Sequence, residues 1–545
     1  MGGVINLVSR KPTKSFESEF RGGVNTGDGS GIEAWNAYAM VGTRQEHYYA
    51  QGSINVVDRD YFTLSNDYAP TPTSLQQGRV RVNSDSHDLR FNAKFGFTPN
   101  DTDEYAFNYT RQDGTKGGLL NVYNNPPAPA NGFWRWPRWD IESVSVLTNT
   151  KLDDTTYLKT KFYLNTFTND LQAFDNISFT TIAATGRFIS YYSDHTYGGS
   201  VEVGTETLPQ NELKVALHFR NDKHSEYNDN RPDSPTARTV EPIQHQEQET
   251  VSVALQDTYH VAPTTDVVMG INYEHYAVKK AEEFATAGGI FSYPLGGANA
   301  FNWQGAVLHH FSDTGEIHFS ISDRARFPNI FELYSTQFST AIPNPNLGPE
   351  RATNYELGAK ETLFGRAHVE AAFFYNDISD LIQTVQVGTL AALLLNRQNV
   401  GNGHFYGFEV ALDVSVNDTL YVGGNFTRTA RKITDSSNPN LRPTGVPTNK
   451  AFLYASWRPS ADLTVTPSVD LASDRWSDRI TVPAQAFPYI RVGNYELVNL
   501  QVEYAVTESL SLAIGGKNLF DQNIELSWGL PQQGRNFYAK GRVNF

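Results

Sequence analysis

The sequence of 545 residues contains no cysteine and only 3 methionines. The chain therefore has no disulfide framework, no thiolate metal site and no cysteine nucleophile. Positive charge is also scarce, because 44 Lys and Arg stand against 59 Asp and Glu and give a formal net charge of −15. Broad nucleic-acid binding requires a basic surface, so we expect no nucleic-acid partner.

Long hydrophobic runs are absent as well. No stretch of 18 apolar residues occurs, so no transmembrane helix is predicted. The first residues lack the charged-then-apolar pattern of a secretory signal. We find no G-x-S-x-G, H-E-x-x-H or phosphate-loop motif, and we expect that the protein is not an enzyme. Two classes remain: a large soluble β protein, or a membrane β-barrel, whose strands leave no hydropathy peak.

Period-two alternation of apolar and polar residues is present along most of the chain. It is clear in segments 89–97, 213–220, 317–322 and 498–504. The alternating segments run for about ten residues or more, the length that a tilted strand needs to cross a bilayer. Aromatic residues make up 13% of the chain, which is typical of proteins whose rings lie at an interface.

The connections alternate between short polar turns and long loops. The short turns are 43–46, 98–101, 262–265, 312–315, 362–365, 416–419, 458–461 and 506–509. The long loops are roughly 60–80, 114–137, 222–245, 280–298, 326–349, 381–402, 431–447, 473–493 and 520–532. Membrane barrels place short turns on the periplasmic side and long loops outside. We therefore predict an all-β, antiparallel transmembrane barrel of about 22 strands, closed by pairing of the last strand with the first.

Four motifs, in order along this pattern, resemble those of the TonB-dependent outer-membrane receptors of the siderophore-receptor type. The strongest lies within 326–360, and the others are FYGFEVAL at 405–412, GKNLFDQN at 516–523 and GRNFYAKGRVNF at 534–545. In addition, GGVIN at 2–6 resembles the strand that closes the plug domain of such receptors. The matching residues are Gly2, Gly3, Phe327, Pro328, Asn344, Pro345, Leu347, Pro349, Glu350, Glu356, Gly358, Asn518, Leu519, Phe520, Gly534, Arg535 and Phe545. Their chemistry favours folding over ligand contact, since Pro345 and Pro349 punctuate a loop before a strand begins.

The resemblance implies a domain organisation, a location and partners. Residues 1–14 would be the C-terminal remnant of a plug domain, and 15–545 the barrel. We expect an integral protein of the Gram-negative outer membrane, a monomer without a cofactor. Its partners would be the TonB–ExbB–ExbD complex, reached through a segment that this sequence lacks, the barrel-assembly machinery and outer-membrane lipid, including lipopolysaccharide.

The expected function is uptake of a scarce ligand, a ferric siderophore first, energised through TonB. Cobalamin, another metal chelate or an oligosaccharide is the alternative cargo on the same scaffold. A passive, plugless, porin-like barrel is a further alternative, which the plug-like residues 2–6 argue against.

One aromatic and basic stretch, NGFWRWPRWD at 131–140, is the leading candidate for ligand contact. Arg stacks on Trp and pairs with anionic groups, so Trp134, Arg135, Trp136 and Arg138 would suit an anionic aromatic chelate. The favoured alternative is an aromatic girdle at the outer interface, in which Trp139 is the best candidate, whereas Arg135 and Trp136 are the better candidates for ligand contact. Weaker candidates for ligand contact are Arg324, Arg326, Tyr334, Phe338 and Arg397.

Metal binding has little support in the sequence. Asp58, Asp60 and Asp67 open the second loop, at about 60–80, where calcium is an alternative, but the loop lacks the fixed spacing and the glycine of known calcium loops. Copper and haem are disfavoured because soft ligands are scarce. Haem receptors of this family place a ligating histidine between the Phe-Pro and NPNL blocks, and 327–347 contains no histidine.

Overall fold

The computed structural model describes residues 10–72, 74–123, 132–336, 341–389, 392–479 and 489–545. These residues form an all-β protein whose one helix, α1 (Ile330–Tyr334), is 5 residues long. Among these residues, no helix is both long and apolar enough to span a membrane.

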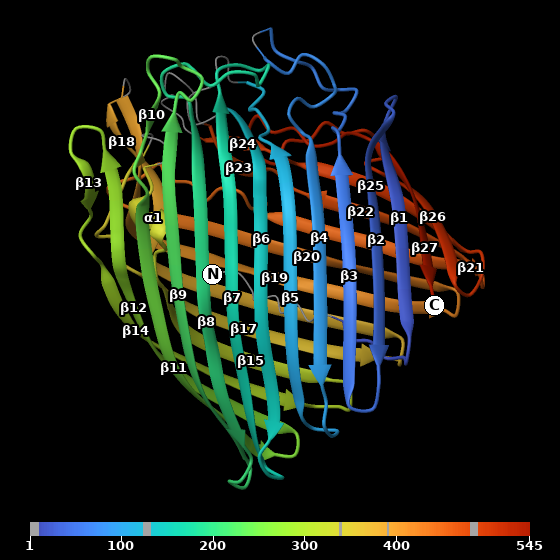
Figure 1. Ribbon diagram of the computed structural model, residues 1–545. Coiled ribbons are helices and arrows are strands. Elements are labelled where there is room, and N and C mark those ends of the chain that lie inside the picture. The colour runs from blue at the N-terminus through green and yellow to red at the C-terminus, as the bar shows by residue number, and fades with distance from the viewer. Residues whose placement is uncertain (1–9, 73, 124–131, 337–340, 390–391, 480–488) are drawn as a thin grey trace.

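Twenty-two strands form a closed antiparallel barrel, as predicted (Figure 1). Its first eleven strands are β1 (Glu17–Gly27), β2 (Ile32–Arg44), β3 (Tyr48–Arg59), β4 (Ser86–Phe97), β5 (Glu104–Gly117), β6 (Phe133–Lys151), β7 (Thr156–Phe174), β8 (Phe188–Thr205), β9 (Asn211–Asn230), β11 (Gln244–Ala262) and β12 (Thr265–Ala285). The other eleven are β14 (Gly297–His310), β15 (Glu316–Arg326), β17 (Glu350–Leu363), β18 (Ala367–Thr389), β19 (Ala392–Asn417), β20 (Leu420–Thr434), β21 (Asn449–Ser460), β22 (Leu463–Ala472), β25 (Tyr495–Ala505), β26 (Leu510–Lys517) and β27 (Asn536–Asn544). Five short strands lie in the loops: β10 (Thr239–Val240), β13 (Gly289–Ser292), β16 (Ala341–Ile342), β23 (Arg475–Asp478) and β24 (Tyr489–Val492).

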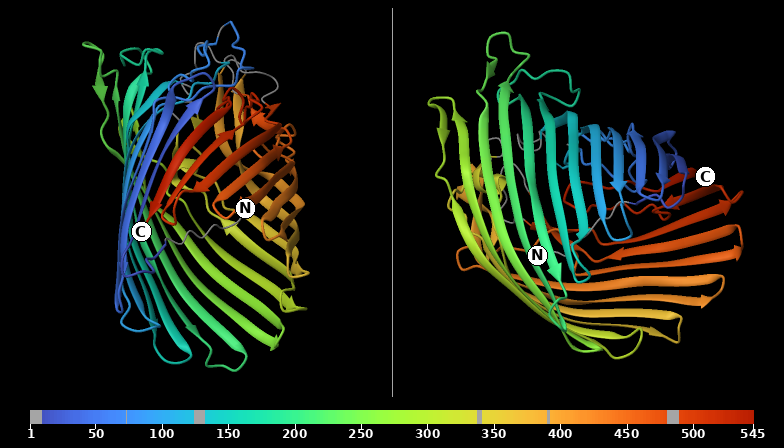
Figure 2. Two further views of the ribbon diagram at one scale, coloured as in Figure 1. Left: turned by 90° about the vertical axis from the view of Figure 1, so that its right-hand side faces the viewer. Right: turned by 60° about the horizontal axis from the view of Figure 1, so that its bottom comes forward.

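The seam of the barrel is the pairing of β1 with β27. The register runs from Glu19 opposite Asn544 to Gly27 opposite Asn536, and the first and last strands lie side by side in Figure 2. Phe545 continues this pairing, since its N–H donates to Ser18 O at 3.0 Å and its carbonyl accepts from Ser18 N at 3.2 Å. Closure leaves no strand edge unpaired at the seam, which a membrane-spanning sheet requires.

A buried carboxylate lies at the periplasmic end of this seam. Glu19 is 2% exposed and forms ion pairs with Arg10 at 3.4 Å, with Arg542 of the last strand at 3.1 Å and with Arg21. Charged groups are held in such a place only when they are paired, so this cluster fixes the ends of the barrel to each other.

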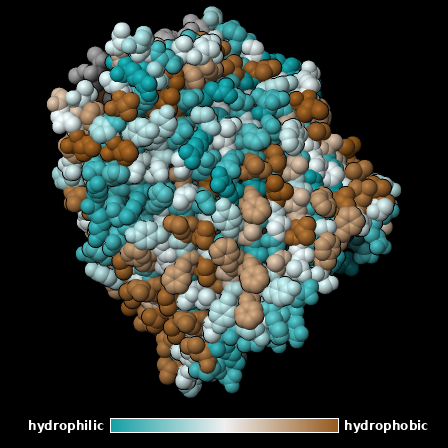
Figure 3. All heavy atoms as spheres, in the orientation of Figure 1, coloured by the Kyte–Doolittle hydropathy of each residue, from teal (hydrophilic) through white to brown (hydrophobic). Residues whose placement is uncertain are grey.

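The alternating pattern assigns one side chain in two to lipid and the other to the lumen. On β15, Ile317 and Phe319 are 41% and 46% exposed on the outer face, and His318 lies on the inner face. Hydrophobic side chains gather over the lower part of the wall shown in Figure 3, and hydrophilic ones dominate its upper part. We infer that the hydrophobic lower part lies in the membrane. The hydrophilic upper part belongs to the segments of the strands that continue beyond the lipid toward the long loops.

One predicted loop is wrong. Residues 381–402 were expected to form a long loop, but β18 and β19 continue through most of this stretch as a hairpin, with Leu381 opposite Val400 and Thr389 opposite Ala392. The hairpin is held because its inner face is apolar and packs on a cluster that contains Ile378, Leu381 and Val385. The turn residues 390–391 lie outside the described part of the chain.

Three outer loops interlock across the seam, and we call them the clasp: residues 60–85, 118–123 and 518–535. Asp521 accepts from Asn66 N at 2.8 Å through its side chain and from the Ser65 hydroxyl through its carbonyl. The Tyr123 and Trp528 rings stack with centroids 5.3 Å apart. The clasp therefore ties loops that are far apart in the sequence but adjacent around the barrel.

The outer loop between β7 and β8 is organised by one carboxylate. Asp175 accepts backbone N–H bonds from Ala183 at 3.0 Å and Ala184 at 2.9 Å. Burial opposes ionisation of Asp175, but these N–H groups outweigh it and hold the pKa of the carboxyl below its ordinary value. The ionised form therefore stabilises this loop.

Candidate ligand site

A β-bulge in β6 brings three tryptophans to one face. Trp136 pairs with Lys116 of β5, Trp139 pairs with Asn169 of β7, and the register shifts between positions 135 and 138. Without the bulge, Trp136 and Trp139 would point to opposite sides, because side chains alternate along a strand. The extra residue reverses the alternation, which is how bulges commonly re-aim side chains.

This face is the lumen. Val144 and Val146 lie opposite Leu164 and Phe162, which are 46% and 55% exposed on the lipid side. Trp139 has the opposite parity to these valines and therefore points inward. The girdle interpretation of these tryptophans is wrong, because an aromatic girdle faces lipid.

The tryptophans form a continuous aromatic wall with one cation on it. Trp134 and Trp136 meet edge to face at 6.2 Å, and Trp136 and Trp139 do so at 6.0 Å. The Lys116 ammonium lies 3.2 Å from the Trp139 ring centroid and 5.0 Å from that of Trp136. We call Lys116, Trp134, Trp136 and Trp139 the tryptophan wall. A cation over two electron-rich ring faces is attracted by their quadrupoles.

The wall continues along β7 and β8 toward an ionic group. Trp134 and Trp136 pack against a cluster of Leu171, Ala173 and Phe188 that also contacts Tyr192. The Tyr192 ring lies 5.7 Å from that of His224, whose two ring nitrogens face Asp194 at 2.5 Å and Glu226 at 3.5 Å. Lys116, Tyr192 and His224 were not predicted as site residues; only their inward parity could have indicated them.

The two predicted arginines of this stretch do not join the wall. Arg135 forms an ion pair with Asp85, and its guanidinium lies 5.6 Å from the Phe179 ring centroid, so it connects β6 to two outer loops. Arg138 pairs with its neighbour Asp140 at 2.8 Å. It has the parity of the lipid-facing valines, and so lies on the outside of the barrel.

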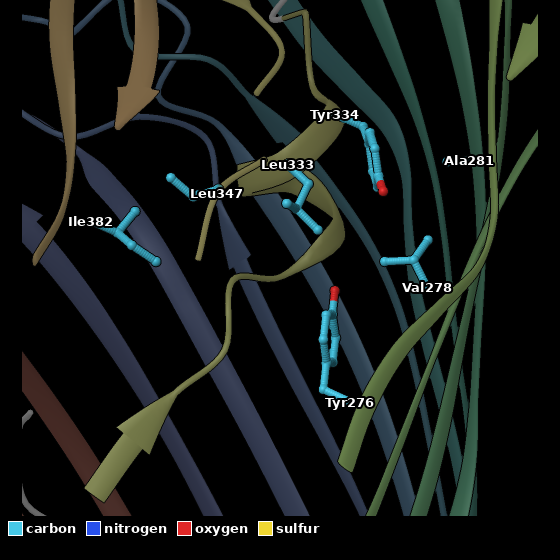
Figure 4. Close-up of a cluster of buried hydrophobic side chains, with 7 residues drawn as sticks. All are labelled: Tyr276, Val278, Ala281, Leu333, Tyr334, Leu347 and Ile382. Atoms are coloured by element: carbon cyan, nitrogen blue, oxygen red, sulfur yellow. The ribbon is translucent and has the colours of Figure 1, made fainter. Parts of the chain in front are cut away.

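The described parts of the loop that follows β15, residues 327–336 and 341–349, fold onto the inner side of the barrel. Leu333 and Tyr334 of α1 are 1% and 0% exposed and pack with Tyr276 and Val278 of β12 (Figure 4). The Tyr334 hydroxyl donates to Pro294 O at 3.2 Å. With its ring and hydroxyl both occupied, Tyr334 is a packing residue in this conformation.

Arg326 is likewise used inside the protein. Its guanidinium pairs with Glu350 at 2.8 Å and with Glu332 at 2.9 Å, at the point where the loop leaves β15. Glu332 also completes the capping box of α1 with Asn329. Arg324, on the inner face of β15, donates to Gln304.

Arg397 holds this loop against the β18–β19 hairpin. Its guanidinium donates to Phe331 O at 3.2 Å and lies 4.5 Å from the Phe331 ring centroid. Its carbonyl accepts from Asn344 Nδ2 at 2.8 Å. Phe338, the remaining candidate, lies outside the described residues.

Comparison with known proteins decides the family. A family model described as "TonB dependent receptor-like, beta-barrel" matches residues 16–519. The chain belongs to the TonB-dependent receptors. It is therefore an integral outer-membrane barrel of a Gram-negative bacterium.

Solved structures show the same fold at low identity. The copper transporter OprC superposes with a TM-score of 0.80 at 14% identity, over 98% of this chain and 82% of that chain. The FrpB iron transporter from Neisseria meningitidis gives 0.76 at 12%, over 98% and 82%. The ferric yersiniabactin uptake receptor FyuA from Yersinia pestis gives 0.75 at 15%, over 100% and 82%.

Most family-motif residues of this receptor are engaged in folding contacts. Phe327 stacks on Tyr276 at 5.2 Å, and Glu350 accepts from Ile382 N at 3.0 Å. Leu347 is buried in the cluster of Figure 4. Close approach explains Gly358 and Gly407, since a Cβ would lie 2.4 Å from the His318 ring at the first and 1.8 Å from Arg428 O at the second.

The last two motifs build the clasp. Asn518, with a φ of 51°, accepts from Gln522 N and donates to Gln522 O, both at 2.9 Å. Gly534 N donates to Thr63 O at 2.9 Å. Arg535 pairs with Asp28 at 2.5 Å. The plug-like residues Gly2 and Gly3 lie outside the described part of the receptor.

Among the described residues, the carboxylates of Asp58, Asp60 and Asp67, considered above as calcium ligands, do not form a metal-binding cluster. Asp58 faces His87 at 3.3 Å. In the described ranges, no group of three or more His, Cys, Asp and Glu side chains is placed to hold a metal ion.

Proposed function

We propose that this receptor takes up an anionic aromatic metal chelate, a ferric siderophore first, and that uptake is energised by TonB. The observation that carries the proposal is the tryptophan wall: three indoles in edge-to-face contact and the Lys116 ammonium face the lumen at its outer end. Aromatic rings bind the planar groups of such chelates, and a partly desolvated cation binds their negative charge.

The solved neighbours support the same class of cargo. Two of the three proteins described above are named for iron: an iron transporter and a ferric yersiniabactin uptake receptor. TonB coupling is supported by membership of the family, which is defined by energised uptake of small ligands.

Copper is the second candidate, because the OprC superposition has a TM-score of 0.80. The ligand chemistry favours it less. Met269 is 52% exposed on the lipid-facing parity of β12. Met40 has the inward parity of β2, but it is 2% exposed and lies opposite Glu19 at the periplasmic end of the barrel. Neither side chain offers a soft sulfur ligand at the outer end of the lumen.

Binding to the wall is measured by tryptophan fluorescence of the complete receptor purified from outer membranes. A ferric chelate should quench the emission, and Trp136→Ala with Lys116→Ala should weaken the apparent affinity about tenfold, since a desolvated cation–π contact contributes about 1–2 kcal/mol. Arg138→Ala is the control, because Arg138 lies outside the barrel. Equal affinity in the double variant and the control would contradict the site.

Cargo and energy coupling need a separate uptake assay. Cells that carry the complete gene should accumulate radioactive iron from a ferric siderophore, and deletion of tonB should abolish this accumulation. Accumulation of copper in place of iron would favour the second candidate. Uptake that survives the loss of TonB would favour a passive channel.

A further inference from the structure

A polar pocket of about 420 Å³ lies at the periplasmic end of the barrel, where short turns join strands β17 to β21. Its lining includes Arg366, Asp418, Tyr421 and Arg458. The pocket is at the opposite end of the barrel from the tryptophan wall, and its volume is within the range of sites that hold small-molecule ligands.

The pocket opens to the lumen. Leu412 of β19 is 43% exposed on the lipid side, and Ser415 has the opposite parity. Tyr421 of β20 lies opposite Ser415 on one side and opposite Ser456 of β21 on the other, so all three face inward. Arg458 stands two positions after Ser456 and has the same parity. The pocket therefore lies where the lumen opens to the periplasm.

The turn between β19 and β20 fixes the backbones of both arginines. Arg366 O accepts from Ser415 N at 2.9 Å, and Arg458 N donates to Thr419 O at 2.7 Å. The turn itself is held by the Asn417 side chain, which accepts from Thr419 N at 2.9 Å. The two arginines therefore flank one turn from opposite sides.

The periplasmic rim is otherwise acidic. Among the described residues of the turns that join barrel strands at this end, Arg366 is the one Lys or Arg, and all the other turns except 263–264 carry Asp or Glu. In the described ranges, neither Arg366 nor Arg458 forms an ion pair, and Asp418 is the one carboxylate that lines the pocket. Both guanidinium groups are therefore free to bind an anionic group.

We propose that this pocket is an exit site, which binds an anionic metal chelate as the chelate leaves the lumen for the periplasm. The inference rests on the proposed function, since the cargo named there is such a chelate. Guanidinium groups bind its negative charge, and the Tyr421 ring contacts its aromatic groups. A ring beside unpaired cations repeats the chemistry of the tryptophan wall. Inorganic phosphate has the charge but would leave most of the pocket empty.

The test is binding of ferricyanide, a compact trianionic iron complex, to the complete receptor in mild detergent, where both ends of the barrel are accessible. This chain has no cysteine, so Ala461→Cys in the turn after β21 places one fluorophore beside the pocket. Ferricyanide should quench the fluorophore saturably. Arg366→Ser with Arg458→Ser should weaken the apparent affinity about tenfold, because two exposed charge contacts are lost. Asp418→Asn should strengthen it, which damage to the fold would not do.

Lys151→Ser is the control, because Lys151 ends β6 at the same rim but pairs with Asp154 at 2.7 Å. Its affinity for ferricyanide should equal that of the labelled parent. Equal affinity in the double variant and the parent would overturn the proposal. Inorganic phosphate that binds as tightly as ferricyanide would overturn the assignment to a chelate in favour of a general anion pocket. Each variant is first checked for the folded barrel by its mobility in unheated gels.

Transport separates the exit site from the proposed function. In cells, the double variant should import the ferric siderophore at a lower maximal rate, while quenching of the wall tryptophans shows an unchanged affinity. Equal maximal rates in the double variant and wild type would overturn the exit role alone. A wild type that neither binds nor imports the ferric siderophore would overturn the proposed function, and the exit role with it.

Discussion

Loss of the Arg326 side chain should loosen the loop at 327–349 while the barrel stays closed. Arg326 is 35% exposed, and its partners Glu332 and Glu350 are 18% and 11% exposed. Arg326→Ala leaves two carboxylates facing each other without their shared cation. Breaking a buried pair costs about 3–5 kcal/mol, and partial exposure reduces this to about 2 kcal/mol here.

The effect is measured by hydrogen exchange resolved to peptides of that loop. A local opening free energy lowered by about 2 kcal/mol raises exchange roughly 30-fold, with no change in peptides from the barrel strands. Glu350→Gln should have a smaller effect, because an amide still accepts from Ile382 N. Arg324→Ala is the matched control: it removes a neighbouring arginine on the same face that has no carboxylate partner among the described residues. Unchanged exchange in Arg326→Ala would refute the view that the ion pairs hold the loop.

Three further outcomes follow from contacts described above. Glu19→Gln should lower the temperature at which the barrel unfolds in heat-modifiability gels, because about 1–2 kcal/mol is lost when three half-exposed arginines lose the carboxylate that they share, and a rise would contradict this. Gly407→Ala should block assembly, since its Cβ would overlap a strand carbonyl, whereas Gly52→Ala, with nothing within 4 Å, should assemble normally. Asp175→Asn should raise exchange in residues 175–187 at neutral pH. Because the folded pKa of Asp175 is lowered, its stabilisation is present above the unfolded value of 3.8 and is lost as pH falls through the folded pKa. The ratio between variant and wild type should therefore approach one in acid, and a constant ratio would contradict the assignment.

The alternation of residue types predicted most of the fold, because a strand between lipid and lumen must repeat its chemistry every second residue. The strand number and closure at Phe545 follow from that constraint. The hairpin at 381–402 escaped prediction because apolar residues stand at adjacent positions, as at 381–382 and 391–395, so no period-two alternation appears. Two outer connections, at 28–31 and 175–187, were not recognised, the first because it is no longer than a periplasmic turn.

The candidate site was predicted only as a stretch of sequence. NGFWRWPRWD was recognised by composition, but the side on which each ring lies depends on the bulge between positions 135 and 138, which the sequence does not mark. Arg135 and Arg138 were predicted on charge alone, and charge does not say whether a carboxylate is adjacent. Asp85 and Asp140 are those neighbours, and only the first comes from a distant part of the chain.

The clasp has a consequence for how the molecule is made. Ser65 and Asp521, whose contact fastens it, are 456 positions apart, so one half is synthesised long before the other. Until the final strand arrives, β1 keeps an open edge that could pair with any other strand. A chain that lacks its last residues would have neither a seam nor a clasp. The unpaired edge of β1 must therefore be protected during biogenesis until the whole polypeptide has been made. The contacts of the clasp form only when the last strand has closed the barrel.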